Sequence, residues 1–414
     1  MKRVDDFWEE LARNGQEVFE LTSDAAVPSA HIYPEAPVLS PDGTKLILHR
    51  HADEHTGNYQ NPLHRYELCD LADGGALRPI SDEARAAAPC MSPCGRWVYY
   101  FVDETPHHPG RILLRRLELA TWERTTVAVL DGRIPGHRVE ACAPLYGLAT
   151  IRRDGTKLAI GTRLSGSPKD YPETGLLIFD VCDGSVEMIL HGPSYYNMHL
   201  QYCRSPEHLG DLLIQENHGA VFDASGKCVH LVTAPGCDIH VLRDDGMDLR
   251  TMAWGRLESE DCRGHQCWRG NTPYALGAAT VLSGPQTGDV RLLEGLPVRS
   301  SDHLGAATPG GTSRNLTEGL IGPRIDHFAT DEAGSRLISD GLFEDGWKIQ
   351  LSELDAPLEG GLRNLTTLVR LGPSKVHPHP FLSPDGGTAF FNSDITGTLQ
   401  AYMIRNLPAL AARS

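Results

Sequence analysis

A short phrase that combines a tight turn with a strand recurs along this chain of 414 residues. The phrase begins with Ser-Pro-Asp-Gly or a close variant, and the residues after it are largely apolar, as in a buried strand. Because Pro presets one turn torsion and Gly supplies a positive φ, each copy predicts a corner that leads into a strand. The five clear copies are residues 40–48, 92–100, 153–160, 331–338 and 383–391.

The spacing of these copies sets the size of the repeating unit. Their turn glycines are Gly43, Gly95, Gly155, Gly334 and Gly386. The first three are 52 and 60 residues apart, and the last two are 52 apart. The remaining gap of 179 residues has room for two weaker copies, which we place at 204–207 and 268–271. Units of roughly 60 residues, each large enough for four strands, predict an all-β, seven-bladed β-propeller. Six or eight blades, or two separate β domains, are the alternatives.

The amino-terminal residues have a different pattern. Residues 1–14 are rich in charged side chains and carry Phe7 and Trp8, which is typical of a short amphipathic helix. We therefore expect a helical segment over residues 1–20 and the propeller over residues 21–414. The segment lacks the apolar core of a signal peptide, and no apolar run in the sequence approaches the roughly 18 residues that would span a bilayer.

The charge and the cysteine content limit which partners and which cellular compartment we expect. The chain has 54 acidic and 38 basic residues, a formal net charge of −16. Nucleic-acid binding depends on clustered Lys and Arg, so we expect no nucleic-acid partner, and no membrane partner either. The ten cysteines are scattered without the spacing of a zinc ribbon. They predict mostly buried, reduced thiols in a cytoplasmic protein. The sequence makes no prediction of oligomeric state.

Histidines precede several of the turn-and-strand phrases. His377 and His379 lie at i and i+2 around a proline, so an extended backbone would present both imidazoles on one face. His327 occupies the corresponding position before the preceding phrase. Equivalent positions on adjacent blades face the same end of the central channel, so these three side chains predict a divalent-metal site. On the ligand types alone Mn²⁺, Zn²⁺ and Fe²⁺ remain open.

Two further segments repeat the arrangement. His265, in Gly-His-Gln-Cys-Trp, begins one blade, and His199, in His-Leu-Gln-Tyr, begins the blade before it. A single such histidine is more often hydrogen-bonded to backbone. Four such segments favour one polar site at the axial opening, where small-molecule sites of propellers lie.

These segments resemble the oligogalacturonate lyases of polysaccharide lyase family 22. The resemblance is carried by the His-Pro-His-Pro run at 377–380 with the Ser-Pro-Asp-Gly and Phe-Asn-Ser-Asp that follow it, by residues 264–268, which resemble the family's Thr-His-Glu-Phe-Trp, and by residues 199–202. It extends from about residue 190 to the end of the chain.

The resemblance implies an axial Mn²⁺ site whose metal histidines are His327, His377 and His379. It makes His265 the catalytic base. The family's fourth ligand, a Gln, falls at Ser374, so water, substrate or Gln201 would have to supply that ligand. The family's helper Arg has no counterpart near residues 237–239; Arg243, Arg263 and Arg269 lie nearby, and the role is assigned to none of them. With His199, the residues Gln201, Arg269 and Ser374 complete the expected substrate-binding set.

The expected reaction is β-elimination from a short acidic oligosaccharide of the pectin type. A base removes the proton α to a carboxylate and the oxygen on the β carbon leaves. A cation on the carboxylate stabilises the charge that accumulates there, and a His suits the base because its unperturbed pKa is about 6.5. The alternative is a non-catalytic propeller that binds a sugar or a protein. A peptidase-associated propeller is disfavoured because the sequence has no Gly-x-Ser-x-Gly elbow.

Overall fold

The fold is described from a computed structural model. The residues that the structure describes are 1–5, 8, 10–11, 14–52, 59–231, 236–256, 260–281, 303–318, 320, 324–355 and 360–409. Within these ranges the protein is nearly all-β, with two short 3-10 turns, η2 (Pro193–Tyr195) and η3 (Pro206–His208). None of the helices in the described part of the chain has the length and apolarity to cross a membrane.

Three antiparallel four-stranded sheets come from the first half of the chain. The first consists of β3 (Ser29–His31), β4 (Lys45–Arg50), β5 (Arg65–Asp70) and β6 (Ala76–Pro79). The second consists of β7 (Ala86–Met91), β8 (Trp97–Asp103), β9 (Ile112–Glu118) and β10 (Arg124–Leu130). The third consists of β11 (Ala141–Ile151), β12 (Lys157–Leu164), β13 (Thr174–Asp180) and β14 (Val186–Gly192). In each, sequence neighbours are spatial neighbours, as in an up-and-down meander.

The middle of the chain forms an eight-stranded sheet and a separate hairpin. The larger sheet consists of β15 (Gln201–Tyr202), β16 (Asp211–Asn217), β19 (Cys237–Arg243), β20 (Arg250–Thr251), β21 (Glu260–Trp268), β22 (Ala275–Val281), β23 (His303–Ala307) and β24 (Arg314–Asn315). The hairpin consists of β17 (Val221–Phe222) and β18 (Cys228–His230). Strands β19 and β21 share only the pair Cys237 and Cys262, so this narrow junction divides the larger sheet into two four-stranded halves.

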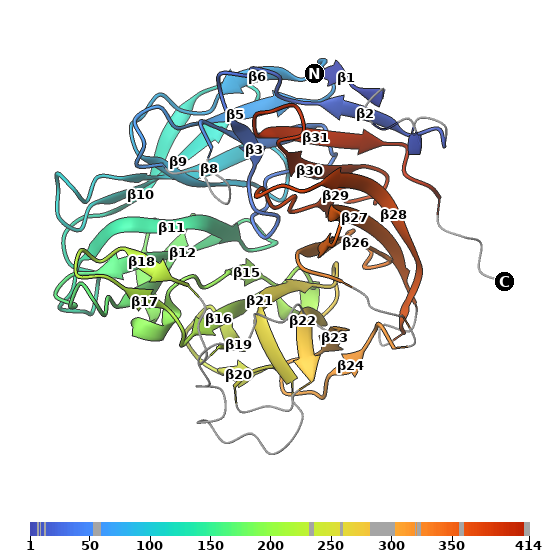
Figure 1. Ribbon diagram of the computed structural model, residues 1–414. Coiled ribbons are helices and arrows are strands. Elements are labelled where there is room, and N and C mark those ends of the chain that lie inside the picture. The colour runs from blue at the N-terminus through green and yellow to red at the C-terminus, as the bar shows by residue number, and fades with distance from the viewer. Residues whose placement is uncertain are drawn as a thin grey trace.

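Two sheets complete the chain. One is four-stranded, with β25 (Phe328–Thr330), β26 (Arg336–Phe343), β27 (Gly346–Leu354) and β28 (Leu362–Gly372). The other has five strands in the order β1 (Lys2–Arg3), β2 (Glu17–Glu20), β31 (Gln400–Arg405), β30 (Ala389–Ser393) and β29 (Phe381–Leu382). The sheets follow one another around a central axis, from blue at the top of Figure 1 through green and yellow to red beside the blue again. This is the arrangement of a β-propeller.

Among the described residues of the expected amino-terminal helix, Glu10 and Leu11 are helical, and no longer helix is seen there. Residues 6, 7, 9, 12 and 13 of that segment lie outside them, and the named elements of residues 1–20 are strands. Strand β2 pairs antiparallel with β31, with Val18 opposite Ile404. Trp8 packs edge-on against Phe391 and Tyr402, at ring-centroid distances of 5.7 and 5.6 Å. The segment is therefore part of the last sheet, where burial of Val18 and Trp8 stabilises pairing.

The predicted corners are present. The five turn glycines have φ between 65° and 74°, the left-handed region that glycine adopts without strain. In the first copy the Gly43 amide donates to the Ser40 carbonyl at 2.8 Å. The weaker copy at 268–271 has Gly270 at φ 50°. The weaker copy at 204–207 overlaps the 3-10 turn η3. The turn chemistry thus sets the start of the second strand of each unit.

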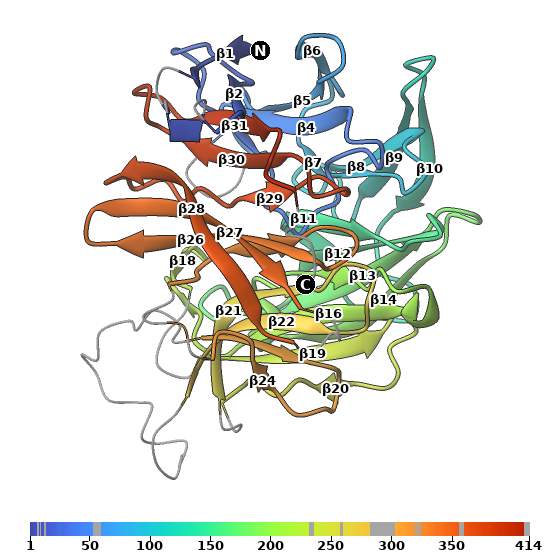
Figure 2. The same cartoon turned by 90° about the vertical axis from the view of Figure 1, so that its right-hand side faces the viewer.

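Neighbouring sheets pack face to face through apolar side chains. Phe101 of β8 meets Phe179 of β13 edge-on with ring centroids 5.1 Å apart. Figure 2 shows the later sheets stacked one above another, from β31 at the top through β27 to β22. Such packing leaves the first strand of each sheet at the axis, which is where the candidate site lies.

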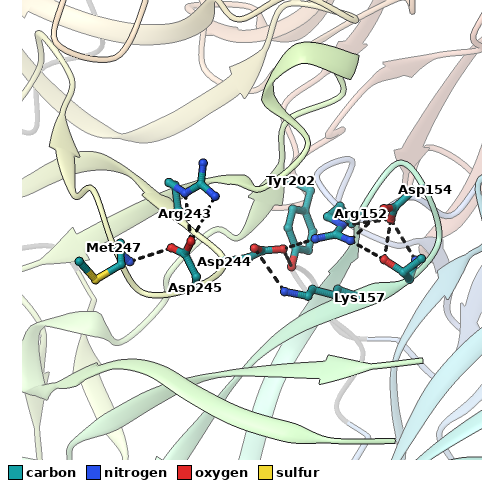
Figure 3. Close-up of polar contacts among 9 residues, drawn as sticks. Arg152, Asp154, Lys157, Tyr202, Arg243, Asp244, Asp245 and Met247 are labelled. Atoms are coloured by element: carbon teal, nitrogen blue, oxygen red, sulfur yellow. Dashed lines mark hydrogen bonds and ion pairs between the residues drawn. The ribbon is translucent and has the colours of Figure 1, made fainter. Parts of the chain in front are cut away.

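A buried carboxylate joins the third sheet to its neighbour. Asp244 lies between Arg152, Lys157 and Tyr202 (Figure 3). Its oxygens accept from Arg152 Nη1 at 2.8 Å and from the Tyr202 hydroxyl at 3.3 Å, and pair with Lys157 Nζ at 3.4 Å. Removal of a partly buried carboxylate leaves its donors without their acceptor.

We therefore expect Asp244→Asn to lower the free energy of unfolding by about 2 to 3 kcal/mol, measured by urea denaturation. The neighbouring Asp245 pairs with Arg243 at the surface, at 3.1 Å, and is about half exposed. Asp245→Asn is the matched control, for which we expect a loss within about 0.5 kcal/mol. Equal losses for the two variants would contradict the assignment.

Candidate metal centre

Three imidazoles converge at the axis. The candidate ligand atoms of His327, His377 and His379 all lie within 4.8 Å of one another. His327 immediately precedes β25, and the other two precede β29, so adjoining sheets present them together. The His327 ring centroid is 5.2 Å from that of His377 and 4.2 Å from that of His379. The predicted cluster is therefore present as a geometric group.

These rings line a cavity of about 540 Å³. The cavity also contains His199, His265, Tyr33 and Arg163, and it is bordered by Tyr146, Tyr196 and other side chains of the third sheet and the loops after it. Its volume is in the range of small-molecule sites, and its wall combines aromatic surface with a few polar groups, as such sites do.

Asp340 organises two of the three imidazoles. This residue of β26 is 0% exposed. Its Oδ1 accepts from the His327 backbone N–H at 2.8 Å and lies 3.1 Å from His327 Nδ1, while its Oδ2 accepts from the His379 backbone N–H at 3.0 Å. With Nδ1–H donated to the carboxylate, His327 presents Nε2 to the cavity, the arrangement found behind metal-bound histidines.

The contact between Asp340 and His379 also explains the unusual backbone conformation of His379. His379 has φ 47°, in the left-handed region that costs a non-glycine residue free energy. The hydrogen bond from its backbone N–H to Asp340 helps to hold it there. Strain of this kind is found where a site over-determines the position of a side chain.

His265 forms an ion pair beside the cluster. Its Nδ1 is 2.9 Å from Asp326 Oδ1, and its ring centroid is 4.3 Å from that of His327. Burial lowers the pKa of His265, but the hydrogen bond and charge of Asp326 outweigh it and raise the pKa above its usual value. Burial raises the pKa of Asp326, but the hydrogen bond from His265 and the charges of the nearby imidazoles outweigh burial and hold this pKa far below its usual range. Asp326 thus orients His265 and makes it a stronger base.

Tyr33 occupies the centre of the histidine group. It follows β3, and its ring centroid lies 4.8 Å from His379, 5.5 Å from His199 and 5.8 Å from His327. Burial, followed by the charge of Glu35, raises the pKa of Tyr33 well above its usual value, so its hydroxyl stays protonated. Tyr33 could have been found from the sequence, because it lies 10 residues before the turn glycine Gly43. His377 lies a similar number of residues before the turn glycine Gly386.

His199 reaches the cavity as predicted by its position. Its Nδ1 lies 2.8 Å from Glu35 Oε1, and its Nε2 lies 2.8 Å from the amide of Asn197. Its backbone N–H donates to the Tyr146 hydroxyl at 3.1 Å. His199 is therefore held in one orientation by groups from several sheets.

The structure does not bring the other three predicted residues to the imidazoles. The Gln201 side-chain amide donates to the Gln266 carbonyl at 2.8 Å, and Gln201 lines a second cavity on the other side of Tyr33. Arg269 is 2% exposed and donates to the carbonyls of Gly334 and Asp355, at 2.9 and 2.7 Å, so it ties loops together.

Ser374 has a local role instead. Its hydroxyl donates to Asp394 Oδ1 at 2.8 Å and accepts from the Val376 N–H at 2.8 Å. Its carbonyl accepts from Trp347 Nε1 at 3.2 Å, and the Trp347 ring lies 4.7 Å from that of His377. Ser374 thus fixes the segment that carries His377, and it is not among the described residues that line either cavity.

One arginine lies in the wall of the histidine cavity, at a position that no motif in the sequence indicated. Arg163 comes from β12, in a different sheet from the histidines, and its guanidinium carbon lies 5.8 Å from the Tyr196 ring centroid and 5.7 Å from that of Phe222. Of the described residues that line this cavity, it is the only Lys or Arg. A cation held against aromatic faces in this position can receive a carboxylate.

The donor set fits a divalent transition metal. Metal–imidazole distances of about 2.0–2.1 Å require ligand atoms within about 4.2 Å of one another, which a small adjustment of the three rings satisfies. His265, Asp326 and His327 form a second group of possible ligands that shares His327. Imidazoles with the carboxylates of Asp326 and Asp340 nearby suit Mn²⁺, Fe²⁺ or Zn²⁺.

The comparisons agree with the fold. No protein-family model matches the chain, and no curated protein matches it. Among solved structures, it is similar to an oligogalacturonate lyase in complex with manganese, with TM-score 0.66 and 19% identity over 95% of this chain and 94% of the other. It is also similar to the oligogalacturonate lyase of Vibrio parahaemolyticus, with TM-score 0.63 and 17% identity over 94% of this chain and 93% of the other. At these identities the similarity shows the fold.

Proposed function

We propose that this protein is a metal-dependent lyase that cleaves short uronate oligosaccharides by β-elimination in the cytoplasm. The observation that carries the proposal is the convergence of three imidazoles from adjoining sheets, with ligand atoms within 4.8 Å of one another. The manganese named for one similar protein supports Mn²⁺ as the metal. We further propose seven blades, with the eight-stranded sheet counted as two at its one-pair junction.

The chain's own residues supply the remaining chemistry. A divalent cation held by His327, His377 and His379 would act as a Lewis acid on the substrate carboxylate. His265, oriented by Asp326 at 2.9 Å, accepts the proton α to that carboxylate through its Nε2. The bond from the β carbon to the leaving oxygen then breaks, and a carbon–carbon double bond forms. The positive charge nearby favours the neutral form of the base.

The test is elimination activity on defined oligogalacturonates, followed by absorbance of the unsaturated product. We expect His265→Gln to lower kcat/KM by about 10²- to 10⁴-fold, the usual contribution of a positioned base. Metal content should stay at the wild-type level, which separates loss of the base from loss of the centre. A His265→Gln protein as active as wild type would exclude this role.

Arg163 is the second residue that the proposal assigns. As the only cationic Lys or Arg side chain among the described residues of the cavity wall, it would bind a substrate carboxylate in a protein of net charge −16. We expect Arg163→Met to raise KM for oligogalacturonate by about 10- to 100-fold, and Arg163→Lys to recover part of the loss. Arg96→Met, in an exposed ion pair with Glu118, is the control and should leave KM unchanged.

The second candidate function is a propeller that binds a sugar without turnover. The observation in its favour is that the structure brings neither Ser374 nor Gln201 to the three imidazoles as a fourth ligand. Tight binding of an oligogalacturonate without product, unchanged by His265→Gln, would favour this function over the lyase.

A further inference from the structure

A second cavity, of about 330 Å³, lies on the other side of Tyr33 and His265, which line both cavities. Its wall is made by the predicted corners, with Pro41, Pro93 and Pro384 around it. The two cavities therefore occupy one axial passage, divided by those two side chains. No function described above uses the second one.

Two arginines face this cavity. Arg153 and Arg204 both line it, and the Arg153 guanidinium donates to the Arg204 backbone carbonyl, which keeps the two close together. Neither is in an ion pair with a described carboxylate. Arg204 is exposed by its accessible surface, yet burial lowers its pKa. Both arginines are exposed, so a ligand in the cavity can reach them.

The carboxylates in the wall do not neutralise these arginines directly. Glu35 is bound to His199, at 2.8 Å, and Glu332 accepts from the Asn271 amide at 2.7 Å. Glu332 acts on Arg204 through its charge, without an ion pair within 4.0 Å. A guanidinium without a close counter-ion at the wall of a cavity is a site for an added anion.

The segments that carry the arginines are held in place. Arg153 lies between Arg152 and Asp154, whose side chains pair at 2.8 Å, and Arg204 comes two residues after Tyr202. These three neighbours belong to the network around Asp244 (Figure 3). A binding group on a fixed segment loses less conformational freedom when a ligand arrives.

We propose that the proline-bordered cavity is a second ligand site, in which Arg204 and Arg153 bind the carboxylate of a molecule the size of a monosaccharide. The volume is at the lower end of small-molecule sites, and apolar walls that include Trp268 and Phe328 suit the C–H face of a sugar acid. The site is separate from the three imidazoles, so it does not depend on the proposed lyase activity.

The test uses the full chain with His377→Ala, which disables the candidate metal centre. Binding of D-galacturonate is measured by calorimetry, with D-galactose as the neutral probe of the same size. We expect one equivalent of galacturonate to bind and galactose to bind at least about 10-fold more weakly. Adding Arg204→Met should weaken galacturonate binding by about 10- to 100-fold, and adding Arg153→Met should also weaken it.

Arg243→Met, at an exposed ion pair with Asp245, is the control and should change nothing. If Arg204→Met fails to fold, Arg153→Met carries the test. Absence of galacturonate binding in the His377→Ala background would overturn the proposal. So would galactose binding as tightly as galacturonate, or affinity that neither arginine variant changes.

Discussion

His377→Ala is expected to abolish both metal retention and elimination activity. His377 supplies one of three imidazoles whose ligand atoms lie within 4.8 Å of one another, so its loss leaves two ligands on the adjoining sheets. Lewis-acid stabilisation is worth several kcal/mol, and about 4 kcal/mol corresponds to a factor of about 10³ in rate. We therefore expect kcat/KM on oligogalacturonate to fall by at least about 10³-fold. Metal analysis after dialysis should show less than about a tenth of the wild-type content.

The matched control is His107→Ala, because His107 is exposed and outside the cavity. It should keep wild-type metal content and activity. Retention of metal by His377→Ala would show that the cation is held elsewhere, and wild-type activity without metal would remove the lyase proposal in its present form.

Asp340→Asn is expected to weaken metal binding although it replaces none of the three candidate ligands. The carboxylate holds His327 by its backbone and its Nδ1, and holds His379 by its backbone. An amide of the same shape retains one acceptor oxygen but turns its NH₂ toward a second donor. Changes to such supporting groups typically weaken metal binding by about 10- to 100-fold, which competition with a fluorescent chelator would measure.

Asp340→Ala should have a larger effect on stability. It leaves buried donors without acceptors, for which we expect a loss of about 3 to 5 kcal/mol in the free energy of unfolding. Asp345→Asn is the control on the same hairpin, since Asp345 is more than half exposed and pairs with Lys348 at 2.8 Å. An Asp340→Asn protein with wild-type metal affinity would contradict the supporting role.

Local chemistry explains what the sequence could predict. The corners depend on Pro and Gly at fixed offsets, so their recurrence reveals the repeated sheets without any knowledge of long-range contacts. The histidines could be grouped because His327 and His377 precede such corners by similar distances. Tyr33 satisfied the same criterion and was missed because it is not a histidine.

Gln201, expected with His199 in the substrate-binding set, is separated from it by a turn before β15. Residues i and i+2 share a face only in an extended strand, but His199 has φ 49° and Asn197 has φ 62°. The chain therefore turns between His199 and Gln201, and the two side chains enter different cavities. Asn197 offered a weak signal of this turn, because Asn adopts positive φ more readily than most residues.

The remaining residues depend on contacts between distant segments. Arg163 reaches the histidine cavity from a sheet more than 150 residues earlier than His327. Arg269 is close in sequence to the predicted base, yet its side chain turns toward Gly334 and Asp355. Asp340 offered one weak signal, a charged residue in the middle of an apolar strand. The strand Glu17–Glu20 was missed because its conformation depends on pairing with a distant segment, with Val18 opposite Ile404.

The pairing of β2 with β31 has a consequence for biogenesis. The sheet that presents His377 and His379 contains β2 and β31, two strands that are far apart in the sequence. During translation the early sheets can form as they leave the ribosome, but this last sheet has to wait for β31. The candidate centre can therefore form only after β31 has been synthesised, and binding of a cation would report that this sheet has assembled.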